Sequence, residues 1–408
     1  MLELVSPCPG SLSLLAWDGS NSTVSDCIHL GGKVYKPCQL DPSPLRAIPL
    51  PSEATPYGST RKLVDSISSL FQRYTSVSAT TSILLSIFVL ATWFADILPS
   101  APCVVLLGSE AREAARILRL LGLLVRRGLI LRAIAPAGLC SLPLELNPTV
   151  LVDVRRLSKK MWDLFRASGT PDSYVSLSGR LAKLYFARAM YVDGSSCRRE
   201  LGGTVEVTVS ASPNNLPLLD AKAKREILDE FQNQLLCYRL RNLGAVSEAK
   251  IDTKEFGREL ADQAAIFAAS IVDEVMLRQE VLALLGPQDQ HVRAERSTGL
   301  HAAVIETLLV FCHENQAEAH VREIAKLTNE VRIDRESRPD VEARKVGAIL
   351  GDLGLFTTRL DRSGRGIMFL PETRAHIHRL AREYEVASLA TPFPGCKECT
   401  EGREEQVN

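Results

Sequence analysis

The residues best placed for chemistry lie in VVLLGSEAREAARILRLLGLLV, at positions 104–125. An apolar strand, Gly108, a short polar turn and an amphipathic helix follow one another there, which is the order of a phosphate-binding loop. Such a loop requires GxxxxGK[ST]: backbone N–H groups surround the phosphates, the Lys neutralises the β and γ oxygens, and the hydroxyl ligates Mg²⁺. The stretch therefore raises the question of whether the chain binds a nucleotide.

The side chains that would bind a triphosphate are replaced in this stretch. Counted from Gly108, Glu113 stands at the second glycine position, Ala114 where the Lys is required, and Ala115 where the hydroxyl is required. Glu110 and Glu113 would add negative charge beside the phosphates. We therefore expect a loop that does not support hydrolysis.

The acidic half of a nucleotide site is also incomplete. In such sites one carboxylate at a strand end holds Mg²⁺ through water, and the next polarises the attacking water. The segment PTVLVDV places Asp153 at the tip of an apolar run, but Val154 follows it. The N-terminus of the loop helix, with Arg112 or Arg116, could still attract an anion. We group Arg112, Arg116 and Asp153 with Gly108 as a vestigial nucleotide-like site. We expect no catalytic residue and no cofactor.

Strands and helices alternate around these residues. Apolar segments predict strands at 102–107, 127–134, 149–154, 183–192 and 204–211. Periodic segments predict helices at 57–75, capped by Ser59 or Thr60, and at 79–97, 110–126 and 156–168. This alternation predicts an α/β fold with a largely parallel sheet and flanking helices. The segments that follow predict a helical subdomain and a C-terminal winged helix.

The order of these features resembles the primase/helicase-like P-loop ATPases of phages, plasmids and mobile elements. The resemblance covers about 80–240 and rests on TWFADILPSAPCVVLLG, RGLILRAI and LELNPTVLVDV, in which Pro148 and Thr149 introduce the second motif's strand. LYFARAMYV and TVEVTVSA resemble the remaining core strands of that family. The resemblance implies a P-loop NTPase-like parallel sheet with flanking helices. It does not imply hydrolysis, because the chain departs from the family at the residues of the phosphate loop and at Val154 after the strand tip. The order of these elements is also similar to that of certain bacterial proteins. That resemblance implies no activity.

The C-terminal region has the element order of a winged helix. GLHAAVIETLLVFCHE, VREIAKLTNEV and VEARKVGAILGDLGL predict three helices, and FTTRLDRSGRGIMFL predicts two short strands around a glycine-containing turn. In such modules the third helix enters the major groove of DNA and the wing reaches the neighbouring backbone or minor groove. The apolar residues of the third helix share one face; they are Val341, Val346, Ile349, Leu350 and Leu353.

Five basic residues of this region are candidate DNA contacts: Arg344, Lys345, Arg359, Arg362 and Arg365. Residues 344–379 include seven basic and three acidic side chains, a local excess of four positive charges. Phosphate contacts from such residues give salt-dependent binding of low sequence specificity. The alternative is a winged helix that contacts protein or serves only in packing.

Composition restricts the remaining classes of function. Lys plus Arg equals Asp plus Glu at 48 each, so no whole-chain field attracts nucleic acid or membrane. The apolar segment 83–95 is shorter than the about 20 residues that span a bilayer, and indicates a buried helix. The ten scattered cysteines and the lack of a signal-peptide pattern favour a cytoplasmic protein with reduced thiols and no membrane partner.

Metal binding is not expected from the sequence. CKEC at 396–399 has the spacing of zinc or redox sites. A structural zinc site needs four ligands, and the sequence has no second such pair nearby. Cys27 and Cys38, far away in the sequence, are the alternative second pair of ligands. The histidines of the C-terminal region show no ligand spacing: His313, His320, His376 and His378. The two in HIH point to different faces of a helix.

The predicted parts of the chain are a proline-rich arm, an ATPase-like domain, a helical subdomain, a winged-helix domain and a disordered tail. Their ranges are 1–56, 57–216, 217–296, 297–387 and 388–408. We expect the arm to be poorly ordered or draped on the body.

Three hypotheses for function remain open. The first is a non-hydrolysing ATPase-like scaffold with a winged helix, acting as a DNA-associated accessory or regulatory protein. The second is an active ATPase or helicase-like motor with an atypical loop, and the third is a protein-interaction module. The absence of the Lys and the hydroxyl disfavours an enzyme, and homo-oligomerisation is left open.

Overall fold

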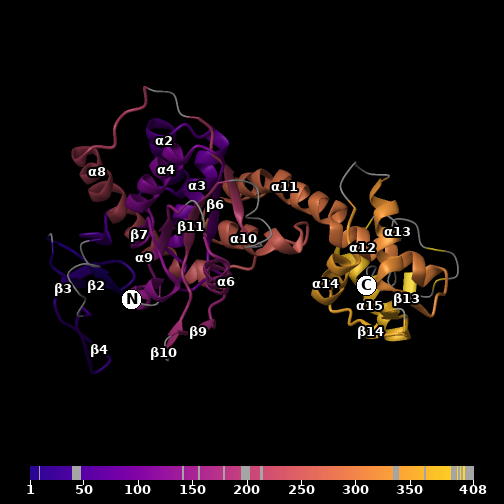
Figure 1. The fold of residues 1–408 in the computed structure, drawn as a ribbon. Helices are drawn as coiled ribbons and strands as arrows, with labels where there is room; N and C mark the ends of the chain where they lie inside the picture. The colour runs from indigo at the N-terminus through magenta and orange to yellow at the C-terminus, as the bar shows by residue number, and fades with distance from the viewer. Residues whose placement is uncertain are drawn as a thin grey trace. The chain divides into compact units, whose positions relative to one another are not determined.

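The computed structural model describes residues 1–8, 10–38, 47–139, 142–154, 157–177, 180–193, 203–211, 215–333, 340–362, 364–386, 393, 396 and 398–399. The chain forms two compact units, Met1–Asp289 and Gln290–Asn408, shown in Figure 1. The predicted tail lies outside the described residues except for Phe393, Cys396, Glu398 and Cys399.

A five-stranded parallel sheet forms the centre of the first unit. Its strands in spatial order are β12 (Val205–Thr208), β6 (Cys103–Leu107), β11 (Arg188–Val192), β8 (Thr149–Val152) and β7 (Gly128–Leu131). The register pairs Val104 with Val205 on one side and with Ala189 on the other. The strands are mostly apolar on both faces because helices cover both. The predicted α/β class, with a parallel sheet and flanking helices, is confirmed.

Two hydrophobic cores lie on opposite faces of this sheet. Leu106 and Tyr191 join the first core, and their strand neighbours Val105 and Met190 join the second. The first core contains α2 (Thr60–Tyr74), α3 (Ala79–Thr92) and α4 (Ala111–Leu124). The second contains α5 (Pro136–Leu139) and α6 (Lys159–Ala167).

The predicted starts of the first two helices are confirmed in detail. Ser59 caps α2 by accepting a hydrogen bond from the Lys62 backbone N–H at 3.2 Å. The apolar segment forms α3, which is buried along most of its length, as predicted. Among the described residues, no helix has both the length and the hydrophobicity needed to cross a membrane.

The sheet region also contains a hairpin that the sequence did not predict. Strand β11 begins at Arg188, whereas a strand was predicted from 183. The residues before it form the antiparallel pair β9 (Tyr174–Leu177) and β10 (Arg180–Lys183). A short 3₁₀ turn, η1 (Leu144–Leu146), precedes β8.

The helices that follow the sheet complete the first core. They are α8 (Ala221–Ile227), α9 (Asn233–Glu248), α10 (Arg258–Ala269) and α11 (Val275–Thr298). A π-helical turn at Leu228–Gln232 joins α8 to α9 within the predicted helical subdomain. Residues of α9, α10 and α11 share the core of α2, α3 and α4.

The N-terminal segment forms strands and packs on the rest of the first unit. Strands β1 (Leu2–Val5), β2 (Ser13–Trp17) and β3 (Ser22–Ser25) form an antiparallel sheet. Strands β4 (Ile28–Leu30) and β5 (Lys33–Tyr35) form a hairpin, joined by two glycines with positive φ, as a tight primed turn requires.

Glu3 of β1 ties this segment to the rest of the unit. Its buried carboxylate accepts hydrogen bonds from Arg126 at 3.1 Å, Arg127 at 3.2 Å and Arg239 at 2.5 Å. Arg239 also binds both oxygens of Asp96, at 2.8 and 2.7 Å. Burial alone would raise the pKa of Glu3, but the three arginines lower it to about 2. We call these five residues the Glu3 network.

The second unit packs helices against a three-stranded sheet of order β13-β15-β14. Its elements along the chain are α12 (Leu300–His313), β13 (Glu318–His320), α13 (Val321–Ile333), α14 (Ala343–Asp352), β14 (Thr358–Arg359), β15 (Arg365–Met368) and α15 (Pro371–Glu383). The predicted apolar residues are all buried in the core of this unit: Val346, Ile349 and Leu350 lie on α14, and Val341 and Leu353 lie just before and just after it. Strand β13 was not predicted.

Candidate functional site

Gly108 is required by the packing of the sheet. It follows β6 with φ +148°, and a Cβ atom there would lie 2.5 Å from the Val209 carbonyl oxygen. The Tyr191 hydroxyl donates a hydrogen bond to the Gly108 carbonyl at 2.9 Å. The glycine is therefore explained by the close approach of the chain after β12, without reference to a phosphate.

The turn after β6 is too short to surround a phosphate. Strand β6 ends at Leu107 and α4 begins at Ala111, so only Gly108, Ser109 and Glu110 lie between them. The positions that correspond to the second glycine, the Lys and the hydroxyl all lie inside α4. Glu113, at the second glycine position, and Ala114, at the Lys position, are both buried there, so neither is open to a ligand.

A buried carboxylate occupies the first turn of α4. Glu113 is 1% exposed, and its Oε1 accepts a hydrogen bond from the Ser76 backbone N–H at 2.5 Å. The Arg116 Nη1 lies 3.5 Å from the other carboxylate oxygen. The N-terminus of a helix stabilises a negative group. The Glu113 carboxylate is that group here, so it occupies the position that would otherwise attract a phosphate.

The structure brings together three of the four predicted site residues of this region. Arg112, Arg116 and Asp153 line one open depression of about 460 Å³, and Gly108 is not part of its lining. Arg119 and Arg132 line it as well, and the sequence analysis missed both. The spacing of Arg112, Arg116 and Arg119 along one helix face would have predicted Arg119.

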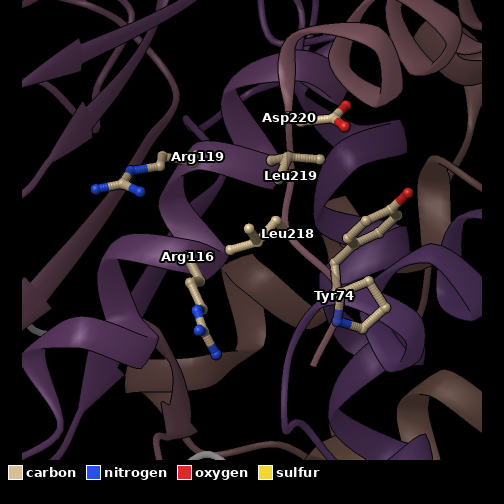
Figure 2. A pocket seen from close by; sticks show the side chains of 7 residues that line it. Tyr74, Arg116, Arg119, Leu218, Leu219 and Asp220 are labelled. Atoms are coloured by element: carbon tan, nitrogen blue, oxygen red, sulfur yellow. The ribbon is translucent and has the colours of Figure 1, made fainter. Parts of the chain in front are cut away.

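This depression can hold an anion but offers little for catalysis. The Arg132 Nε lies 3.8 Å from Asp153 Oδ2, so an arginine faces the carboxylate that a Mg²⁺ site would use. A second cavity of about 270 Å³ shares Arg116 and Arg119 and is otherwise lined by Tyr74 and the segment 217–220 (Figure 2). Figure 2 shows Leu218 near Arg116; the Leu218 side chain is largely exposed, whereas Leu219 is partly buried against the first core.

A separate groove of about 680 Å³ lies in the second unit. Arg344 of α14 and Arg365 of β15 line it together with Arg322, which the sequence analysis missed. Arg365 donates a hydrogen bond to the Thr357 carbonyl at 2.7 Å, which directs its guanidinium along the hairpin. Helix α14 and the β14–β15 hairpin therefore present cations to the same groove.

The other candidate DNA contacts lie outside the lining of this groove. Lys345 follows Arg344 on α14, Arg359 belongs to β14, and Arg362 lies in the turn between the two hairpin strands. All three are exposed. Arg359 also donates a hydrogen bond to the Asp361 carbonyl at 3.3 Å.

No protein-family model matches the chain, and no curated protein matches it. Among solved structures, the chain is similar to the C-terminal region of NrS-1 in its A-form apo structure, with 12% identity, a TM-score of 0.36 and coverage of 86% of this chain and 84% of that one. It is also similar to Cdc6p from Pyrobaculum aerophilum, with 13% identity, a TM-score of 0.20 and coverage of 74% and 93%. Because both TM-scores are low, these similarities carry no functional argument. The proposed function rests on the residues of the chain itself.

Proposed function

We propose that the chain is a DNA-associated accessory protein. Its ATPase-like unit serves as a scaffold that does not hydrolyse nucleotide, and its second unit is a winged helix that contacts DNA. The observation that carries the proposal is the groove lined by Arg344 of α14 and Arg365 of β15. A helix and a hairpin that present cations to one groove suit a duplex, because phosphates flank the major groove on both sides.

The chemistry of the loop supports a scaffold without hydrolysis. Stabilisation of charge at the γ-phosphate contributes several orders of magnitude in rate, and a lysine and a Mg²⁺ ion normally supply it. Here the turn is short, Glu113 is buried beside it, and Arg132 faces Asp153. An active motor is therefore the weaker candidate.

We expect the double variant Arg344→Ala/Arg365→Ala to bind a short DNA duplex about 10–100-fold more weakly at about 0.1 M salt, because two phosphate contacts are lost. The slope of log K against log salt should fall by about one for each lost contact. Fluorescence anisotropy over a salt series measures both quantities.

The matched control for this experiment is Lys222→Ala/Lys254→Ala, which removes two exposed cations of the first unit and should leave binding unchanged. Equal DNA affinity of the wild-type chain and the Arg344/Arg365 variant would reject DNA contact through this groove. The protein-interaction module would then be favoured.

We expect no Mg²⁺-dependent heat of ATP binding in calorimetry, because the turn after β6 has neither the length nor the side chains to hold a triphosphate. Phosphate release in the presence of DNA should stay at the background rate, and Asp153→Ala should not change it. DNA-stimulated phosphate release that Asp153→Ala abolishes would establish the motor instead.

A further inference from the structure

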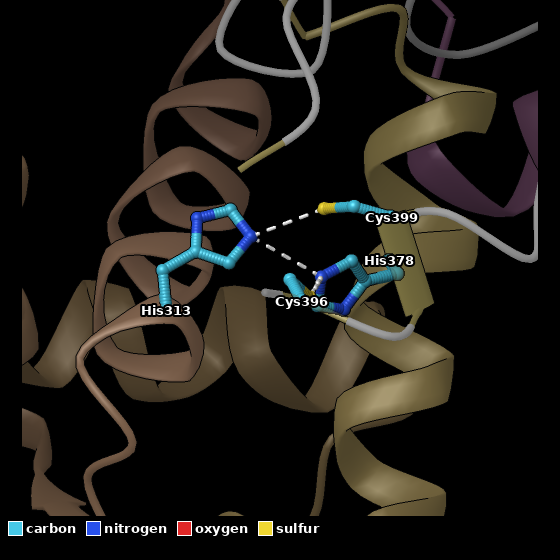
Figure 3. Close-up of side chains that lie close together, drawn as sticks. All are labelled: His313, His378, Cys396 and Cys399. Carbon is cyan, nitrogen blue, oxygen red and sulfur yellow. Dashed lines mark hydrogen bonds between the residues drawn. The ribbon is translucent and has the colours of Figure 1, made fainter. Parts of the chain in front are cut away.

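Two histidines and two cysteines converge at one point of the second unit (Figure 3). His313 is the last residue of α12, His378 lies on α15, and Cys396 and Cys399 come from the CKEC segment. The His313 and His378 Nε2 atoms are 3.3 Å apart, and each is also 3.3 Å from one sulfur, Cys399 Sγ and Cys396 Sγ respectively. One ligand atom from each of the four residues lies within 4.8 Å of all the others.

We propose that His313, His378, Cys396 and Cys399 bind one Zn²⁺ ion in a tetrahedral Cys₂His₂ site. With Zn–N distances of about 2.0–2.1 Å and Zn–S distances of about 2.3 Å, the donor atoms of such a site stand about 3.3–3.8 Å apart. Three of the six donor separations are 3.3 Å, at the edge of this range, and all six are within 4.8 Å, so side-chain movements of about 1 Å or less complete the geometry. Two sulfurs and two imidazoles are a donor set that selects zinc.

The His378 ring is held in the tautomer that a metal requires. Its Nδ1 lies 2.8 Å from the Arg374 carbonyl oxygen, and because a carbonyl can only accept, Nδ1 carries the proton. In the neutral ring Nε2 therefore presents a lone pair to His313 and Cys396. A backbone carbonyl that orients a ligating histidine in this way is the usual outer partner of a zinc site.

The surroundings hold the two imidazoles in place. The Arg374 guanidinium donates to the Cys312 carbonyl at 2.6 Å, which joins α15 to the end of α12 beside His313. Phe393 stacks on the His313 ring with centroids 4.5 Å apart and planes 7° apart.

The donor set also indicates what the ion does. Four protein ligands leave no position open for water or substrate, which is typical of a structural site. The CKEC pair has the C-x₂-C spacing of such sites, and the histidine pair comes from two helices packed in one core. The ion would fasten the Cys396–Cys399 segment to α12 and α15, and binding would release about two protons from the thiols.

The test measures zinc in the full chain, purified with reductant and without added metal. We expect about one zinc ion per chain by mass spectrometry of the metal, and protection of Cys396 and Cys399 from alkylation that is lost after treatment with a chelator. Because both measurements use the wild-type chain, they do not depend on whether a variant folds. Zinc below about 0.1 per chain, or equal alkylation of both thiols with and without chelator, would overturn the proposal.

Variants assign the ligands. Cys399→Ser and His378→Gln should each reduce bound zinc at least 10-fold. The matched controls are Cys38→Ser, at an exposed thiol of the first unit, and His376→Gln, two residues from His378 on the same helix. Both controls should retain the ion. Zinc that persists in Cys399→Ser and His378→Gln would place it elsewhere and reject this site.

Discussion

Glu3→Gln is expected to lower the free energy of unfolding by about 3–5 kcal/mol. The substitution keeps the shape of the side chain but leaves Arg126, Arg127 and Arg239 buried around a neutral amide. Removal of one partner from a buried ion network is costly because the remaining charges are no longer compensated. Denaturant unfolding followed by circular dichroism gives the difference between the wild-type chain and the variant.

The matched control is Glu280→Gln, which breaks the half-exposed ion pair with Arg61 and should cost less than about 1 kcal/mol. The pH dependence gives a second readout. The pKa of Glu3 is about 2 in the folded chain against 4.5 for the free carboxyl, so its stabilising effect is present above pH 4.5 and is lost as the pH falls toward 2. That shift corresponds to on the order of 3 kcal/mol, which Glu3→Gln should lack. Equal acid sensitivity of both proteins would contradict the role of the network.

Gly108→Ala is expected to lower the free energy of unfolding by about 2–4 kcal/mol, from backbone strain and from overpacking. The added methyl group would meet the Val209 carbonyl oxygen at 2.5 Å, in a backbone conformation that side chains rarely adopt. Thermal unfolding of the two proteins measures the loss. The result separates a glycine kept for packing from one kept for a phosphate.

Gly286→Ala is the control, because a Cβ atom there meets nothing within 4 Å and the residue lies inside α11. It should be neutral or stabilising by about 0.5–1 kcal/mol. A Gly108→Ala protein as stable as the wild-type chain would show that β12 does not constrain this turn.

The sequence predicts the elements of this fold well where the signal is local. Ser59 precedes an apolar-periodic run and caps α2, and two consecutive glycines join β4 to β5. The alternation of strands and helices predicts a parallel sheet. The π-helical turn between α8 and α9 does not interrupt the periodicity of the sequence enough to be seen.

Features that depend on distant contacts could not be predicted in the same way. Glu3 meets Arg239 across 236 positions, and nothing near Glu3 indicates that it is buried. His313 meets His378 across 65 positions, so neither shows ligand spacing in the chain. The expectation that CKEC has no second ligand pair nearby holds along the sequence, whereas in space the two histidines lie beside it.

The length of the turn after β6 sets a requirement for any attempt to engineer phosphate binding into this chain. A Lys and a hydroxyl introduced at positions 114 and 115 would both lie inside α4 and not in the turn. The buried Glu113 carboxylate would also have to be removed, because its negative charge lies in the first turn of this helix, where a phosphate would otherwise be attracted. Single substitutions in this stretch are therefore expected not to create a phosphate site.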